Sequence, residues 1–197
     1  MKRLAFLLAV AIAIGVVAAP AFGNLKIKDL SDTIAWGHDT TEVRNTCQMI
    51  VVHSNYYAGG DRSQWDLQGC IDQFYRYGVA PHYMIDRQGT IYRLTPDSLV
   101  AWHAGESVLP NDTIAHLNYY SLGIEVINSK RYGPTNAQYR QLARLINALC
   151  DQYDITHIMG HSDIAPQRKT DPWAFSWPRL EALLSHRARA ARTWTTQ

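Results

Sequence analysis

Runs of apolar residues along the chain predict several β-strands. Residues 48–54 form a continuous, largely β-branched apolar run without alternation, which indicates a strand that is buried on both faces. Four further segments predict strands or strand ends, of which the first two pair as a β-hairpin: residues 82–86, 90–94, 99–103 and 121–128. The segments between these strands show a different spacing, which is typical of helices.

Apolar residues at helical spacing predict a helix between Ser63, which is placed to cap it, and Gly78, which is placed to end it. The longest helix begins at residues 134–136 and carries an apolar stripe of Tyr139, Leu142, Leu145, Ile146 and Leu149. A last short helix covers residues 178–184. Strands and helices that interleave around a hairpin predict a single α/β domain with a central mixed sheet flanked by helices.

The beginning of the chain has the layout of a secretory signal peptide. Residues 1–3 are basic, residues 4–17 are nearly all apolar, and a patch of small residues follows. The apolar stretch is short for a membrane span and Pro20 closes it. We expect residues 1–21 to be removed by cleavage after Ala21, with Gly23 as the alternative site, and the protein to be exported to the periplasm or secreted.

Two further boundaries follow from changes in composition. Residues 24–47 mix polar residues with scattered apolar ones, which predicts an irregular N-terminal arm before a domain over residues 48–185. The basic residues 186–197 predict a frayed, solvated helix end, with contact to an anionic envelope polymer as the alternative.

The net charge bears on the kinds of partner that the protein binds, and the cysteine content bears on disulfide formation. A net charge of +2 does not favour nucleic acid or an acidic surface as a partner. The odd set Cys47, Cys70 and Cys150 allows at most one intramolecular disulfide, and the sequence does not indicate which pair would form it. Cys70 and Cys150 follow apolar residues at helical spacing, so we expect them in the core. We expect a monomer with no nucleic-acid partner and no stable membrane span after signal removal.

Candidate catalytic and metal-binding side chains are concentrated in residues 157–173. One glycine and two prolines in this segment disfavour a regular helix. Neutral imidazole and carboxylate are ligands that suit Zn²⁺, and a catalytic zinc takes three protein ligands. His161 and Asp171 are two candidates, and His53, near the end of a predicted strand, is the best candidate for the third. Spacing alone supports this site no better than structural histidines and a turn at Asp171.

Three other polar or aromatic residues lie in or beside predicted strands. Glu125 lies in an apolar run, where a buried carboxylate requires a charge, a metal or a hydrogen-bond partner. A nearby zinc-bound water would meet that need, and the alternative is an exposed position on an edge strand. We interpret His82 as a structural residue hydrogen-bonded inside the sheet. Trp102, taken alone, is interpreted as a core residue.

Four segments, in this order along the chain, resemble successive motifs of the type 2 N-acetylmuramoyl-L-alanine amidases: VVHS (51–54), AWHAG (101–105), LGIE (122–125) and HSDIAPQRKTDP (161–172). The resemblance covers roughly residues 48–184. That family shares its fold with the peptidoglycan-recognition proteins and with phage lysozyme-amidases, so the resemblance implies a peptidoglycan-recognition/amidase-type fold.

The resemblance also implies a site and a reaction. It implies that His53, His161 and Asp171 bind zinc, that Glu125 handles protons, and that Lys169 assists the transition state. The implied reaction is zinc-dependent hydrolysis of the amide between the lactyl group of N-acetylmuramic acid and L-alanine, in peptidoglycan or muropeptides.

The sequence does not fully assign the substrate-binding part of the site, and it leaves two alternative functions. Trp102, His103 and Asn128 are candidate substrate contacts. The family often continues Asp-Pro-Gly, whereas here Trp173 follows Pro172, so this wall of the cleft is not assigned. One alternative function is a non-catalytic muropeptide-binding protein of the same fold, although such relatives typically lack a zinc ligand. Another is a zinc peptidase that cuts within the stem peptide.

Overall fold

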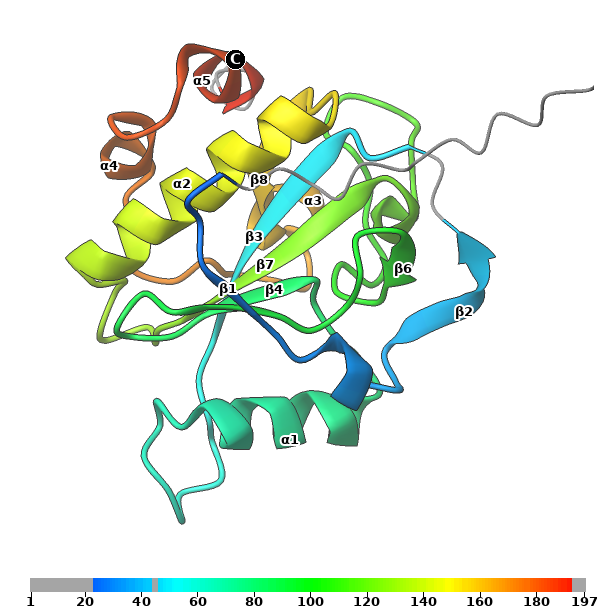
Figure 1. Ribbon diagram of the computed structural model, residues 1–197. Coiled ribbons are helices and arrows are strands. Elements are labelled where there is room, and N and C mark those ends of the chain that lie inside the picture. Colours follow the sequence, from blue (N-terminus) through cyan, green and yellow to red (C-terminus); the bar gives the residue numbers. More distant parts are fainter. Residues whose placement is uncertain (1–22, 44–45, 193–197) are drawn as a thin grey trace, which may run out of the picture.

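The computed structural model describes residues 23–43 and 46–192, so the predicted signal peptide (1–21) lies outside the described residues. A six-stranded mixed sheet in the order β1-β5-β4-β7-β3-β8 forms its centre. These strands are β1 (Ile27–Asp29), β3 (Met49–Asn55), β4 (Tyr83–Ile85), β5 (Ile91–Arg93), β7 (Ser121–Ile127) and β8 (His157–Gly160). The predicted α/β class with a mixed sheet is confirmed (Figure 1).

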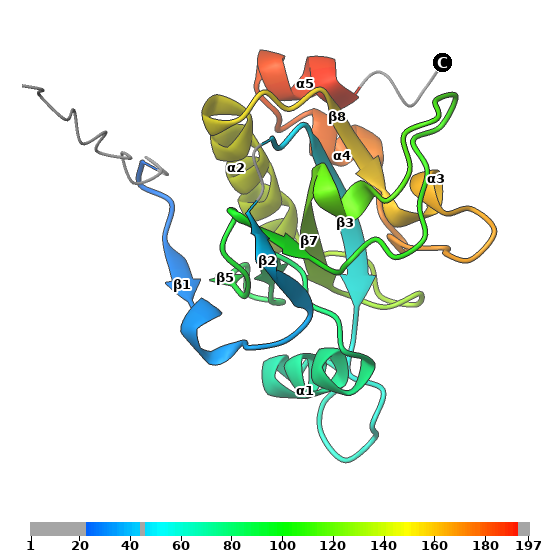
Figure 2. The same cartoon turned by 90° about the vertical axis from the view of Figure 1, so that its right-hand side faces the viewer.

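Helices and a small second sheet surround this centre. The helices are α1 (Leu67–Tyr77), α2 (Asn136–Gln152), α3 (His161–Ile164), α4 (Trp177–Glu181) and α5 (His186–Arg192), with 3-10 turns at Ser31–Thr33 and Leu117–Tyr119. The second sheet pairs β2 (His38–Val43) with β6 (Leu99–Ala101). Strand β2 lies to the right of the central sheet in Figure 1 and in front of it in Figure 2. In the described part of the chain, no helix is long and apolar enough to cross a membrane.

The two seven-residue strands of this sheet, β3 and β7, are parallel neighbours and every residue of both is buried. This burial explains why their sequences are apolar without alternation. The hairpin β4–β5 is antiparallel as predicted, and Gly89 takes the positive φ of 88° that its turn requires.

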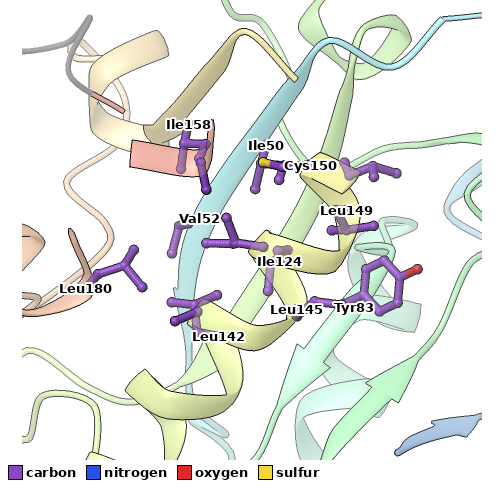
Figure 3. Close-up of a cluster of buried hydrophobic side chains, with 14 of the residues drawn as sticks. Ile50, Val52, Tyr83, Ile124, Leu142, Leu145, Leu149, Cys150, Ile158 and Leu180 are labelled. Atoms are coloured by element: carbon purple, nitrogen blue, oxygen red, sulfur yellow. The ribbon is translucent and has the colours of Figure 1, made fainter. Parts of the chain in front are cut away.

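Helix α2 covers one face of the sheet and forms the main core with it. Thr135 caps this helix and shares a capping box with Gln138, which confirms the predicted start. Figure 3 shows the apolar residues that strands and helix bury together, among them Ile50, Val52, Ile124, Leu142, Leu145 and Leu149. Burial of these side chains fixes the strands whose ends carry the candidate site.

Helix α1 packs on the opposite face, where Met84 of β4 joins its core. Its N-terminal cap is Asp66, whose side chain accepts a hydrogen bond from the backbone of Gly69 at 2.6 Å. The predicted cap, Ser63, is wrong because its hydroxyl accepts from the backbone of Trp65 in the turn before the helix. Gly78 ends the helix in the left-handed conformation, as predicted.

The expected irregular N-terminal arm is wrong for much of its length. Strand β1 pairs in parallel with β5 and becomes an edge of the central sheet, and β2 pairs with β6. β1 has only three residues, and all of them are at least partly exposed. Its place in the sheet therefore depends on backbone hydrogen bonds, and its sequence has no apolar pattern that would predict a strand.

The expected solvated C-terminal end is also wrong over residues 186–192. These residues form α5, in which Ala188 and Ala191 are buried in the main core. Arg192 is only 4% exposed, and its guanidinium lies 3.7 Å from the centre of the Trp177 ring. This helix packs through small alanines and a stacked arginine. It therefore lacks the large apolar residues by which a buried helix face is usually predicted.

All three cysteines are buried as free thiols. Cys70 and Cys150 lie in the core as predicted, and burial raises the pKa of each thiol to about 12. Such thiols are poor nucleophiles, which makes Cys70 and Cys150 packing residues.

Candidate metal centre

Two neighbouring parallel strands bring the candidate histidines together. Val52 of β3 is the register partner of Gly160 of β8, and the residue that follows in each case is a histidine, His53 or His161. The irregular backbone predicted for this region is wrong at its start, since β8 and the single turn of α3 occupy it. Asp171 returns to the same place from the following loop, where its carbonyl accepts a hydrogen bond from the backbone of Ser162.

The three predicted ligands converge on one point. Nδ1 of His53 lies 2.9 Å from Nδ1 of His161, and Oδ2 of Asp171 lies 3.2 Å from His161 Nδ1 and 3.6 Å from His53 Nδ1. All three residues are buried. A tetrahedral zinc with bonds of about 2.0–2.1 Å holds its ligand atoms roughly 3.3 Å apart, so these separations fit a single ion.

The contacts around the rings also fit a metal. Nε2 of His161 lies 3.1 Å from the carbonyl oxygen of Ala104, which can only accept, so this nitrogen carries the proton. The lone pair of His161 Nδ1 then faces the carboxylate of Asp171, which also accepts a weak hydrogen bond from the backbone of Ser54 at 3.4 Å. A cation shared by these electron pairs relieves their repulsion.

The electrostatics favour the metal-binding form of His53 and of Asp171. Burial, followed by the neighbouring His161, lowers the pKa of His53 to about 4, so its ring is neutral near pH 7. Burial alone would raise the pKa of Asp171, but its interactions with the rings of His161 and His53 in the metal-free protein outweigh burial and hold that pKa well below its usual range. Neutral imidazole and ionised carboxylate are the forms that bind a divalent cation.

Glu125 lies beside this cluster on β7. It is 8% exposed, and its Oε2 has no hydrogen-bond partner among the described residues. Burial, followed by the charge of Asp171, raises the pKa of Glu125 well above its usual value, and the Lys169 ammonium opposes that shift. A buried carboxyl group with a raised pKa and a free oxygen is suited to accept and return a proton. The predicted exposed alternative for Glu125 is therefore wrong.

A cavity of about 600 Å³ opens onto the cluster. Its lining includes Glu125, His161, Asp171, Lys169, Arg168 and Trp173. Lys169 is half-buried and lines the same cavity as Glu125, whose pKa its charge lowers. Arg168, which directly precedes Lys169, also lines the cavity, and its sequence context did not indicate this position.

Two of the three candidate substrate contacts also line this cavity. Trp102 is 45% exposed at its edge, so its interpretation as a core residue is wrong. The reason is that β6 pairs with β2 outside the central sheet, which leaves the residue after β6 at the surface. His103 lines the cavity as well, and its Nδ1 lies 3.0 Å from Nε2 of His53.

Asn128 is placed behind the cavity wall. It is fully buried, its Oδ1 accepts from the hydroxyl of Ser54 at 2.7 Å, and its Nδ2 donates to the carbonyl of Trp173 at 2.7 Å. The same Ser54 oxygen accepts from the backbone of Trp173 at 2.8 Å. Asn128 therefore fixes the loop that carries Trp173, and its prediction as a substrate contact is not supported by this placement.

His82 has the structural role that the sequence predicted. Its Nδ1 accepts a hydrogen bond from the backbone of Gly123 at 3.0 Å, and its Nε2 lies 3.1 Å from the carbonyl of Leu99. The ring is fully buried and ties β7 to β6.

Two imidazoles and a carboxylate form a possible metal site, and a buried carboxyl group lines the cavity beside it. Such a set of groups is typical of metal-dependent hydrolases. Residues 43–174 match the family model of the type 2 amidases, described as N-acetylmuramoyl-L-alanine amidase. The chain belongs to this family, which confirms the resemblance.

Curated relatives support the same assignment. The 1,6-anhydro-N-acetylmuramyl-L-alanine amidase AmpD of Escherichia coli is 44% identical over 110 residues, which is 54% of this chain and 59% of AmpD. The N-acetylmuramoyl-L-alanine amidase AmiD of Escherichia coli is 34% identical over 121 residues, 52% of this chain and 43% of AmiD. The matches thus span about half the length of these relatives.

Solved structures share the fold. A crystal structure of a selenomethionine derivative of AmpD superimposes with a TM-score of 0.66 at 29% identity, over 81% of this chain and 94% of that one. AmiD of Escherichia coli in complex with anhydro-N-acetylmuramic acid-L-Ala-D-γ-Glu-L-Lys gives a TM-score of 0.59 at 28% identity, over 70% of this chain and 57% of that one.

Proposed function

We propose that this protein is a zinc-dependent amidase that hydrolyses the bond between the lactyl group of N-acetylmuramic acid and L-alanine of the stem peptide. The observation that carries the proposal is the convergence of His53, His161 and Asp171 at a cavity that also exposes Glu125. Membership of the amidase family and the muropeptide named in the AmiD complex support this substrate class.

His53, His161 and Asp171 would hold the zinc ion. The chemistry that zinc supplies when bound is Lewis-acid activation of a water molecule and of the substrate carbonyl. Glu125 accepts the proton of the attacking water on its free oxygen and transfers it to the nitrogen of the leaving L-alanine. Its raised pKa allows it to hold that proton between the two transfers.

Lys169 acts on the substrate oxygen. Its half-buried cation shares the cavity with Glu125, where negative charge develops on the carbonyl oxygen as the water attacks. In a site that excludes bulk water, such a cation stabilises the oxyanion more than it would in solution. Trp102 and Trp173 provide apolar walls against which the muropeptide packs.

We also propose that the enzyme is exported and acts on peptidoglycan or its fragments in the periplasm or outside the cell. The support is the basic, apolar and small-residue succession of residues 1–23. A fusion of these residues to a reporter that folds only after export tests this point, and retention of the reporter in the cytoplasm would contradict it.

The experiment that tests the function compares the zinc-loaded protein and its Glu125→Gln variant on purified peptidoglycan and on a soluble muropeptide. Mass analysis is expected to show intact stem peptide and a sugar with a free lactyl group, with the variant strongly impaired. Shortened stem peptides would indicate a peptidase instead. Binding of muropeptide without any product from the parent would indicate a non-catalytic binding protein.

A further inference from the structure

The adjacent residues His103 and Ala104 contact the outer nitrogens of both candidate imidazole ligands. Nδ1 of His103 lies 3.0 Å from Nε2 of His53, and the carbonyl oxygen of Ala104 lies 3.1 Å from Nε2 of His161. Both ligand rings face the cluster with Nδ1. One short segment after β6 is therefore in contact with both rings on the side away from the metal.

The direction of the hydrogen bond between His53 and His103 follows from the next residue outward. The hydroxyl of Ser121 donates its only proton to the carbonyl of Leu117 at 2.6 Å. That hydroxyl and the Ser121 carbonyl, at 3.3 and 3.4 Å from Nε2 of His103, can therefore only accept from it. Nε2 of His103 therefore carries a proton. In a neutral imidazole the other nitrogen is an acceptor, so with His103 neutral its Nδ1 accepts and Nε2 of His53 is the donor.

The structure holds the two residues in place. Oδ1 of Asn118 accepts from the backbone N–H of His103 at 3.1 Å and of Ala104 at 2.8 Å. Arg168 donates to the Ala104 carbonyl at 3.0 Å, which gives that oxygen a second donor. A Cβ at Gly123 would lie 2.4 Å from the His103 ring, so the glycine provides the space in which the ring lies.

We propose that His103 is a positioning residue that fixes the tautomer of His53, with Asn118 holding it, so that the Nδ1 lone pair of His53 is presented to the zinc. This inference rests on the proposed zinc site. It gives His103 a role through His53, where the sequence had suggested a substrate contact. Outer partners of this kind typically contribute 10- to 100-fold to metal affinity.

The test uses two replacements of different chemistry. His103→Phe keeps a planar ring in the space beside Gly123 but has no acceptor, whereas His103→Asn places an amide oxygen near the position of Nδ1. His157→Phe is the matched control, because His157 lies at the far end of β8 from the cluster. Zinc affinity is measured by competition with a chromophoric chelator, and thermal unfolding of the metal-free proteins checks that each variant folds.

We expect His103→Phe to weaken zinc binding about 10- to 100-fold, His103→Asn to restore most of it, and His157→Phe to leave it unchanged. Nitrogen-15 NMR of the zinc-loaded parent is expected to show His53 protonated on Nε2. Equal affinity of the parent and His103→Phe, or equal loss in the Phe and Asn variants, would overturn the proposal. Neither readout needs a substrate, so an inactive protein that binds zinc would contradict the proposed amidase function but leave this inference standing.

Discussion

His53 of β3 and Glu125 of β7 are register partners on adjacent parallel strands. Side chains paired in this way point to the same face of a sheet, so the backbone itself sets the candidate base beside the metal ligand. Both strands are completely buried, which leaves little freedom for the two groups to separate. The proposed proton transfer by Glu125 depends on this arrangement.

The first prediction concerns proton transfer. Glu125→Gln keeps the size of the side chain but cannot accept a proton near pH 7, so turnover is expected to fall about 10²- to 10⁴-fold. Zinc content is expected to stay at the parent level because the ligands are unchanged. Steady-state hydrolysis and metal analysis check this, with Lys169→Ala as a comparison that lowers turnover without removing the base. Turnover of Glu125→Gln within a few-fold of the parent would leave Glu125 as a structural residue.

The second prediction concerns stability and pH in the metal-free protein. Burial and the charge of Asp171 raise the pKa of Glu125 in the folded state, so the folded protein binds this proton more tightly than the unfolded chain. The resulting stabilisation is complete below the unfolded value of about 4.3 and is lost as the pH rises through the folded pKa. Glutamine is neutral at every pH and does not show this loss.

We therefore expect metal-free Glu125→Gln to be more stable than the metal-free parent near pH 7.5, and the difference to shrink toward pH 4. Urea unfolding of chelator-treated proteins across this range measures it. A variant that is less stable than the parent at every pH would show that Glu125 is ionised and well solvated in the folded protein.

The third prediction concerns the metal ligands. Asp171→Ala is expected to lose zinc and activity together, since two neutral imidazoles remain without the charge that the carboxylate supplies. Zinc is also expected to raise the unfolding temperature of the parent. At a zinc concentration 1,000-fold above the dissociation constant, binding adds about 4 kcal/mol to the free energy of unfolding. Metal analysis and calorimetry check both points. If purified Asp171→Ala retains stoichiometric zinc, the ligand assignment is wrong.

The fourth prediction concerns the C-terminal helix α5. Arg192→Ala is expected to destabilise the protein by about 2 kcal/mol, because a buried guanidinium stacked on Trp177 is lost. Arg187→Ala is the control, since Arg187 and its partner Asp154 are exposed and such pairs contribute about 1 kcal/mol or less. Urea unfolding measures both, and equal effects would show that the stacking of Arg192 on Trp177 contributes no more stability than an exposed ion pair.

The sequence allowed the central strands and the chemical groups of the site to be predicted, for physical reasons. β3 and β7 are buried on both faces, which leaves an unbroken apolar run, and Glu125 interrupts one such run. Histidine and carboxylate side chains identify a possible zinc site by their donor atoms alone. The family motifs then gave the set of three ligands that the geometry brings together.

The remaining features depend on tertiary contacts that no local pattern records. β1 forms because β5 offers it an edge, and Trp102 is exposed because β6 pairs outside the central sheet. Asn128 follows a buried strand much as a site residue would, yet its amide hydrogen-bonds with Ser54 and the loop at Trp173. The positions of these residues depend on which segments pack against each other, and the fold of the whole chain determines this packing.

The most direct test of the proposed amidase reaction is hydrolysis of a defined muropeptide in water enriched in oxygen-18, followed by mass analysis of both products. Attack of water on the lactyl carbonyl places one labelled oxygen in the new carboxylate of the muramic acid and none in the peptide, which leaves with a free L-alanine amine. The zinc-loaded parent is expected to give this distribution, and Glu125→Gln is expected to give little product. Label in a carboxylate of a shortened peptide, or intact muropeptide after incubation with zinc-loaded protein, would contradict it.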